Sequence, residues 1–117
     1  MKEINIQRLI QIELSNAGVL TFRNNCGQYK TDQGYVIRYG VGNPGGSDLI
    51  GIIPTVITEE MVNKTLGVFA AIEVKTPTGK ASKDQLNFID VILQNGGIAG
   101  ICRSPEDALK LISGGRT

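Results

Sequence analysis

The sequence contains no histidine among its 117 residues. Histidine is the usual general base near neutral pH and the commonest ligand of transition metals in proteins. Its absence excludes hydrolases with a Ser-His-Asp triad, cysteine proteases that use histidine, histidine-metal nucleases and zinc hydrolases. Any hydrolytic chemistry in this chain must therefore use carboxylates, lysine and metal ions bound by hard oxygen atoms.

Long apolar runs and paired cysteines are also missing. No stretch reaches the length of about eighteen apolar residues that a membrane span requires, and the polar Glu3 and Asn5 interrupt any signal-peptide core. Cys26 and Cys102 are far apart and form no CxxC motif, so we expect two reduced thiols and no zinc or redox site. The sequence predicts a soluble cytoplasmic protein without membrane contact.

A large charge of one sign is the third absence. The formal net charge is only +1, so the composition does not indicate a nucleic-acid-binding protein in the way that a strongly basic domain would. The length and the hydrophobic content of 41% suffice for one packed core. We therefore expect a single domain over residues 1–117, and the charges have to be considered locally.

The spacing of apolar residues predicts alternating helices and strands. Stop and start signals frame the helices: Gly18 follows the first, Gly96 and Gly97 follow the second, and Ser104 with Pro105 begins the third. Helices are expected over residues 3–17, 82–94 and 105–112, with a short one over 59–63. Strands are expected over residues 19–23, 35–39, 47–53, 67–76 and 98–102, and a turn-rich connection after the first of them. This order predicts an α/β fold with a mixed central β-sheet flanked by helices.

Two charged residues interrupt the apolar strand at residues 67–76. Glu73 and Lys75 are two positions apart, so their side chains leave the same face of the strand, while Val74 points to the other face. Burying unpaired charges costs several kcal/mol, so both side chains need partners. A structural ion pair between the two would satisfy this need. Their position at the C-terminal end of the strand, where α/β sheets place ligand sites, favours a functional role.

Further carboxylates precede this strand. Asp48 follows the glycine-rich turn at residues 40–46, and Glu3 opens the first helix. Two or three carboxylates with a backbone carbonyl form the oxygen-rich environment that Mg²⁺ or Mn²⁺ prefers. Such an ion polarises a phosphodiester and activates water, and a neighbouring lysine stabilises the charge that develops on the phosphate. The pattern thus favours metal-dependent phosphodiester hydrolysis.

The residues that carry this chemistry resemble a known nuclease pattern. Gly46-Ser47-Asp48 followed by Glu73-Val74-Lys75 resembles the PD-(D/E)xK signature, with Ser47 where many members have proline. The similarity is closest to the VRR-NUC family, small virus-type nucleases related to archaeal Holliday junction resolvases, and it covers nearly the whole chain. Further matching segments are Glu3, Ile6 and Gln7, residues 22–25 with Gly27, Leu49, Gly79-Lys80 and Gln85-Leu86. The resemblance implies a restriction-endonuclease-like fold with an αβββαβ core.

The resemblance also implies an activity and the residues for it. The activity would be metal-dependent DNA endonuclease cleavage with Mg²⁺ or Mn²⁺. The implied metal ligands are Asp48, Glu73 and the Val74 carbonyl, with Glu3 contributing directly or through water. Lys75 would be the catalytic lysine, and Gln85 a helper near the attacking water or phosphate. Because the resolvase relatives act as symmetric dimers, the resemblance further suggests a homodimer that cuts branched DNA such as four-way junctions.

Several assignments have alternatives. Glu3 also fits a favourable acid at a helix N-terminus. Glu13 lies among the apolar residues of the first helix and is the second candidate for its place in the metal site. Gln85 follows Ser82 by three residues, which is the spacing of a capping box. The glycines at residues 40–46 fit either close backbone approach to a phosphate or a tight turn.

The remaining charges bear on partners and on rival functions. Without the three acids Glu3, Asp48 and Glu73, the formal net charge of +1 becomes +4, which suits a DNA-facing surface. Candidates for phosphate contacts are Arg23, Lys30, Arg38, Lys80, Lys83 and Arg103. The main rival is a non-catalytic nucleic-acid-binding or assembly module on the same fold. A nucleotide-binding loop at residues 78–82 is excluded, since Val74 replaces the required glycine and Ala81 follows Lys80.

Overall fold

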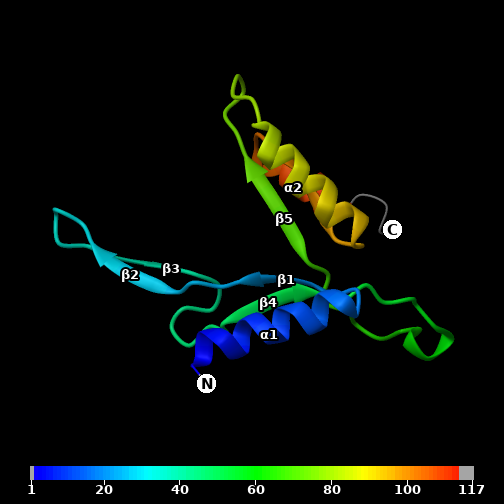
Figure 1. Ribbon diagram of the computed structural model, residues 1–117. Helices are drawn as coiled ribbons and strands as arrows, with labels where there is room; N and C mark the ends of the chain where they lie inside the picture. Colours follow the sequence, from blue (N-terminus) through cyan, green and yellow to red (C-terminus); the bar gives the residue numbers. More distant parts are fainter. Residues whose placement is uncertain (1, 114–117) are drawn as a thin grey trace. The chain divides into compact units, whose positions relative to one another are not determined.

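The computed structural model describes residues 2–113 as a mixed α/β protein. The chain divides into two compact units, one ending at Ile53 and the other beginning at Pro54, and each is described by itself (Figure 1). The strands pair into three two-stranded sheets. The α/β class is thus confirmed, whereas one central sheet with an αβββαβ core, and a single domain over the whole chain, stay predictions.

The first unit contains helix α1 (Glu3–Asn16) and the antiparallel strands β1 (Leu20–Arg23) and β4 (Leu49–Ile52). Gly18 ends the helix with a φ of +83°, and the chain then enters β1 directly. The predicted helix and both strands are therefore confirmed to within two residues.

The side of α1 that faces β1 includes a polar residue. Gln11 lies on that side, where its Nε2 donates to Thr21 Oγ1 over 3.4 Å. Ile6, Leu9 and Ile10 are instead 44%, 50% and 43% exposed. Apolar residues occur almost all round this helix, so their spacing does not define a single buried face.

A β-hairpin that the sequence did not predict follows β1. Strand β2 (Gly27–Lys30) pairs antiparallel with β3 (Val36–Tyr39) in the first unit. Only a turn-rich connection was expected at β2, because Gly27 suggested a strand break and the polar Gln28 and Lys30 gave no strong alternation. At the base of the hairpin, Asn43 Nδ2 donates to the carbonyl oxygens of Gly27 (2.7 Å) and Tyr39 (2.8 Å).

The second unit is a β-α-β arrangement with a further helix. Strands β5 (Ala70–Val74) and β6 (Ile98–Cys102) are parallel and are joined by helix α2 (Lys83–Gln94), with helix α3 (Pro105–Ser113) after them. A single 3-10 turn, η1 (Glu59–Met61), lies where a short helix was expected. Ser104 caps α3 as predicted, since its Oγ accepts from Asp107 N.

Helices cover both faces of the β5–β6 pair. Glu73 faces α2, and Gly100 faces α3, where a Cβ would lie 3.1 Å from Leu111. The core contains Ile92, Ala99 and Cys102. Leu86, Phe88 and Leu93 of α2 are apolar but 46%, 42% and 51% exposed.

Two predicted absences can be compared with the structure. Both cysteines are free thiols, as expected, with Cys102 buried and Cys26 exposed. Between residues 2 and 113, no helix combines the length and the apolar character that crossing a membrane requires.

Candidate active site

Glu73, Lys75 and Gln85 come together in the second unit. Glu73 Oε1 lies 3.5 Å from Lys75 Nζ and accepts a hydrogen bond of 2.8 Å from Gln85 Nε2. The side chains of Lys75 and Glu73 are only 20% and 31% exposed. The predicted convergence of Glu73 and Lys75 on one face is therefore present, and α2 adds Gln85 to it.

The two contacts constrain Glu73 unequally. The distance of 2.8 Å to Gln85 is that of a well-formed hydrogen bond, whereas 3.5 Å to Lys75 exceeds the usual length of a charge-assisted one. Gln85 therefore fixes the carboxylate, and the Lys75 ammonium is held more loosely. Within residues 2–113 both partners contact Oε1, and no hydrogen bond or ion pair reaches Oε2. That oxygen is available to a cation.

Gln85 forms the capping box that its spacing from Ser82 suggested, and its side chain also contacts Glu73. Its backbone N donates to Ser82 Oγ over 3.1 Å, and its Oε1 accepts from Ser82 N over 2.9 Å, which forms the capping box of α2. Its Nε2 remains free to donate to Glu73. Because both ends of the carboxamide are bound, the cap orients the group that holds the site acid.

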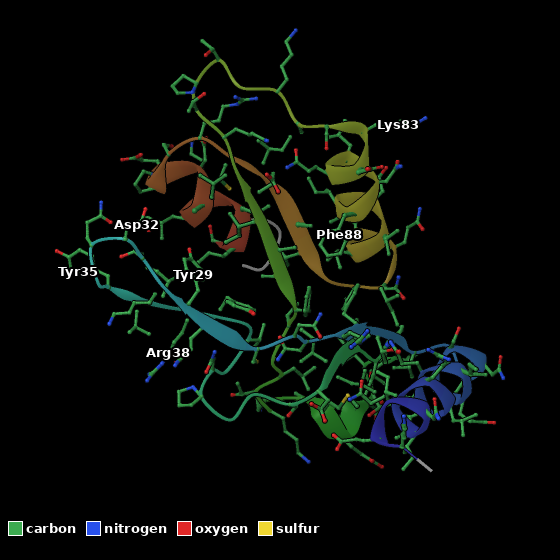
Figure 2. The ribbon with its side chains drawn as sticks, turned by 60° about the vertical axis from the view of Figure 1, so that its left-hand side comes forward. Tyr29, Asp32, Tyr35, Arg38, Lys83 and Phe88 are labelled. Atoms are coloured by element: carbon green, nitrogen blue, oxygen red, sulfur yellow. The ribbon has the colours of Figure 1, made fainter. Side chains whose placement is uncertain are left out.

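A concave space of about 390 Å³ lies between β5 and α2, a size in the range of small ligand sites. Its lining residues are Ala71, Ile72, Glu73, Asp84, Gln85, Phe88 and Ile89. Figure 2 shows Phe88 along α2 and Lys83 at the start of that helix. Asp84, next to Gln85 in the first turn of α2, is a second carboxylate that lines this space. It was not among the site residues proposed from the sequence.

The loop after Lys75 is fixed by Arg103. Arg103 Nη1 donates to the carbonyl oxygens of Thr76 (2.6 Å) and Gly79 (2.7 Å), and Lys75 N donates to Cys102 O over 3.1 Å. Arg103 was expected among the phosphate contacts, and the structure shows Nη1 bound to the protein's own backbone. No local pattern could reveal this contact, because it joins residues 24 to 27 positions apart.

The Val74 carbonyl meets one requirement of a metal ligand. Successive residues of a strand direct their backbone groups to opposite edges, and Lys75 N points to β6, where it donates to Cys102 O. The Val74 carbonyl therefore points to the edge of β5 that β6 does not occupy. The Val74 carbonyl and Glu73 Oε2 are both oxygen donors, the kind that Mg²⁺ or Mn²⁺ prefers.

Asp48 lies in the first unit, where its backbone is firmly held and its side chain is exposed. Asn24 N donates to Asp48 O over 2.8 Å. The Asn24 side chain bonds Val41 N (2.9 Å), Val41 O (2.8 Å) and Ser47 O (2.9 Å). A Cβ on Gly46 would overlap Val41 O, so close packing of the tight turn accounts for this glycine. Asn24 thus sets the turn that leads to Asp48, a role its sequence position did not show.

Glu3 and Glu13 are exposed on α1 in the first unit. Glu3 lies in the first helical turn, as an acid that favours a helix N-terminus would. Over the described range 2–113, no three Asp, Glu or Cys side chains form a metal-binding group. That Asp48 joins Glu73 in a metal site, and that Glu3 or Glu13 completes it, stays a prediction.

The other predicted contacts with DNA are exposed, as phosphate binding requires. Arg23, Lys30 and Arg38 belong to the first unit, and Lys80 and Lys83 to the second. Their assignment to DNA stays a prediction.

A comparison with known protein families gives one finding that bears on this site. The model of the family described as the VRR-NUC domain matches residues 6–106. This family is a PD-(D/E)xK nuclease family. The matched range contains Asp48, Glu73, Lys75 and Gln85 and leaves Glu3 outside. Comparisons with curated proteins and with solved structures found no match.

Proposed function

The chain belongs to the VRR-NUC family of PD-(D/E)xK nucleases and so has a nuclease-type function, and we propose that it is a Mg²⁺- or Mn²⁺-dependent DNA endonuclease. One observation carries the proposal. Glu73 has Oε1 held by Gln85 and Lys75, while Oε2 is available to a cation. A carboxylate and a loosely held ammonium thus lie side by side, as metal-dependent phosphodiester hydrolysis requires.

The proposed metal ligands are Asp48, Glu73 and the Val74 carbonyl, with Glu3 or Glu13 as a further acid. All of these donors are oxygen atoms and none is a thiolate or an imidazole, which favours Mg²⁺ or Mn²⁺ over zinc. When bound, the ion supplies Lewis-acid polarisation of the phosphate and lowers the pKa of the attacking water. Removing the ion with EDTA should therefore stop cleavage.

The chain's own residues then have separate tasks. Gln85 keeps the Glu73 carboxylate in one orientation through the 2.8 Å hydrogen bond. Lys75 lies 3.5 Å from that carboxylate, so its ammonium can turn toward a phosphate oxygen and stabilise the negative charge that develops there. The Arg103 contacts fix the backbone next to Lys75 and limit where this ammonium can reach.

The proposal includes branched DNA as the preferred substrate, a homodimer as the active form and a cytoplasmic location. A two-fold dimer presents two copies of the site to the two-fold symmetry of a four-way junction. The exposed cations Arg23, Lys30, Arg38, Lys80 and Lys83 would supply sequence-independent affinity for phosphates.

The first test uses labelled four-way junction and matched linear duplex, incubated with Mn²⁺, Mg²⁺ or EDTA. We expect cutting only with metal, a preference for the junction, and a dimer by sedimentation. Asp48→Asn should abolish cutting without unfolding the protein, because the Asp48 side chain is exposed and Asn24 bonds only its backbone. DNA that is bound but uncut with every metal would favour the non-catalytic binding module instead.

Gln85 and Ser82 offer a matched pair of variants. Ser82→Ala and Gln85→Met both break the capping box, and each should lower the free energy of unfolding by about 1 kcal/mol. Only Gln85→Met also removes the hydrogen bond to Glu73, and loss of such a supporting partner should lower cleavage by about tenfold or more. Urea unfolding and cleavage rates at saturating Mn²⁺ measure the two effects. Equal loss of cleavage in both variants would show that Gln85 acts only through the helix.

A further inference from the structure

The hairpin of β2 and β3 carries different chemistry on its two faces. Tyr29 is directly opposite Ile37, and Gly27 is opposite Tyr39, so these residues share one face. Thr31 N donates to Tyr35 O over 2.7 Å, which extends the pairing and adds Tyr35 to the same face. All three tyrosines of the chain therefore lie on one face of a two-stranded ribbon.

These tyrosines are not part of a core. Tyr29, Tyr35 and Tyr39 are 57%, 69% and 51% exposed. Figure 2 shows Tyr35 and Asp32 at the tip of the hairpin. The Tyr39 ring lies over Gly27, where it would overlap any added Cβ, so this glycine makes room for the ring. A row of exposed aromatic rings on a protein surface indicates a binding surface.

The opposite face is cationic. Lys30 and Arg38 lie on it as diagonal neighbours, beside Gln28 and Val36. Both are exposed, and neither forms an ion pair with another residue in the range 2–113. Two unpaired positive charges on one face of the ribbon match the negative phosphates of a nucleic acid.

The hairpin also continues into the turn that leads to Asp48. Asn43 ties the hairpin base to this turn through its bonds to Gly27 O and Tyr39 O. At the other end of the turn, Asn24 binds Val41 and Ser47. A ligand held by the hairpin is therefore connected, within the first unit, to the segment that carries a proposed metal-binding acid.

We propose that this hairpin is a DNA-binding arm whose tyrosine face stacks on unpaired bases while Lys30 and Arg38 bind the phosphate backbone. Aromatic rings bind nucleic acids by stacking on the faces of bases, and those faces are accessible where strands separate or branch. Paired bases within a linear duplex stack on each other and offer no free face. This inference rests on the proposed nuclease function. The arm would explain why the nuclease prefers branched or partly single-stranded DNA to a linear duplex.

The unmodified protein provides a direct test. The chain has no tryptophan and three tyrosines, so its intrinsic fluorescence reports on this one face. Titration in EDTA with a DNA duplex that carries a single-stranded flap should quench the tyrosine emission, after correction for DNA absorbance, whereas a blunt duplex should not. Binding of the flapped DNA without a change in emission would overturn the proposal.

Paired substitutions give a second test. Tyr29→Leu with Tyr35→Leu should weaken binding of flapped or four-way DNA by about tenfold or more, the scale of base stacking, with blunt duplex affinity almost unchanged. The matched Tyr29→Phe with Tyr35→Phe keeps the rings and should bind as the wild type does. Lys30→Gln with Arg38→Gln should weaken both DNAs and lower the salt dependence of binding by about one unit per cation.

The outcomes separate the arm from the nuclease. Metal-dependent cutting by the wild type, with unchanged branched-DNA affinity in the leucine variant, overturns the arm and leaves the nuclease standing. Tyrosine quenching and ring-dependent binding, without cutting under any metal, support the arm and refute the nuclease. If sedimentation shows that the leucine variant turns a dimer into a monomer, while wild-type emission stays unquenched by DNA, the face binds a second copy and the proposal fails.

Discussion

Replacing Glu73 by glutamine is expected to lower metal-dependent DNA cleavage by about a thousandfold, because a bound ion contributes several kcal/mol of charge stabilisation to the reaction. Glutamine keeps the shape of the side chain, and its carbonyl oxygen can still accept from Gln85 Nε2. The variant loses the negative charge that would bind the ion. The ion pair with Lys75 is partly exposed, so its loss should cost no more than about 1 kcal/mol of stability.

Two measurements check this prediction. Mn²⁺ titration by calorimetry should show weaker binding in Glu73→Gln, and single-turnover cleavage at high Mn²⁺ should stay slow. Glu60→Gln is the control, because Glu60 is an exposed carboxylate in η1 outside the concave space and its loss should change neither quantity. Wild-type metal affinity and cleavage in Glu73→Gln would contradict the assignment. Asp84→Asn would then test the other carboxylate of that space.

The sequence alone predicted the ends of helices and the bounds of strands where these depend on neighbouring residues in the chain. Gly96 ends the segment of α2 with a φ of +88°, which favours glycine, and Ser104 caps α3 as its position before Pro105 indicated. Strand β6 was predicted with the same bounds that the structure shows, because residues 98–102 form an apolar segment after a glycine pair. Such signals act within a few residues of chain and need no tertiary context.

Elements that depend on pairing were harder to predict. Strand β2 has no apolar alternation of its own and exists because β3 returns along it. The face that α1 turns to β1 was not predicted, for a related reason. Ile4, Ile6, Leu9, Ile10 and Ile12 surround the helix, so the contact is decided by the partner strand and places Gln11 against Thr21.

In the candidate site, too, features set by local spacing were predicted and contacts set by tertiary packing were not. The shared face of Glu73 and Lys75 follows from the two-residue period of a strand, and the spacing of Ser82 and Gln85 predicted the capping box. The hydrogen bond from Gln85 to Glu73 could not be predicted, since it requires α2 to lie over β5. Arg103 was likewise beyond any local pattern, because the chain must complete β6 before its guanidinium can reach the loop after Lys75.

Lys75→Met should lower the maximal cleavage rate by at least about a hundredfold, which is the usual effect of removing one group that stabilises transition-state charge. Methionine keeps an apolar stem of similar length in the partly buried position, so folding should be little affected. DNA affinity should stay within a few fold, because one ammonium contributes little to binding by many phosphate contacts. Mn²⁺ affinity should not fall, since the substitution removes a positive charge 3.5 Å from Glu73 Oε1.

Lys80→Met supplies the contrasting control, because Lys80 is an exposed cation five residues further along the same loop region. Its loss should weaken DNA binding and lower the salt dependence by about one unit, with the rate at saturating DNA unchanged. Single-turnover rates and DNA affinities in Ca²⁺ distinguish the two patterns. If Lys75→Met cuts at the wild-type rate but unfolds at lower urea, the contact with Glu73 is a structural ion pair. A rate loss with unchanged stability, metal affinity and DNA binding would place the Lys75 ammonium at the reacting phosphate, since only the transition state would then depend on its charge.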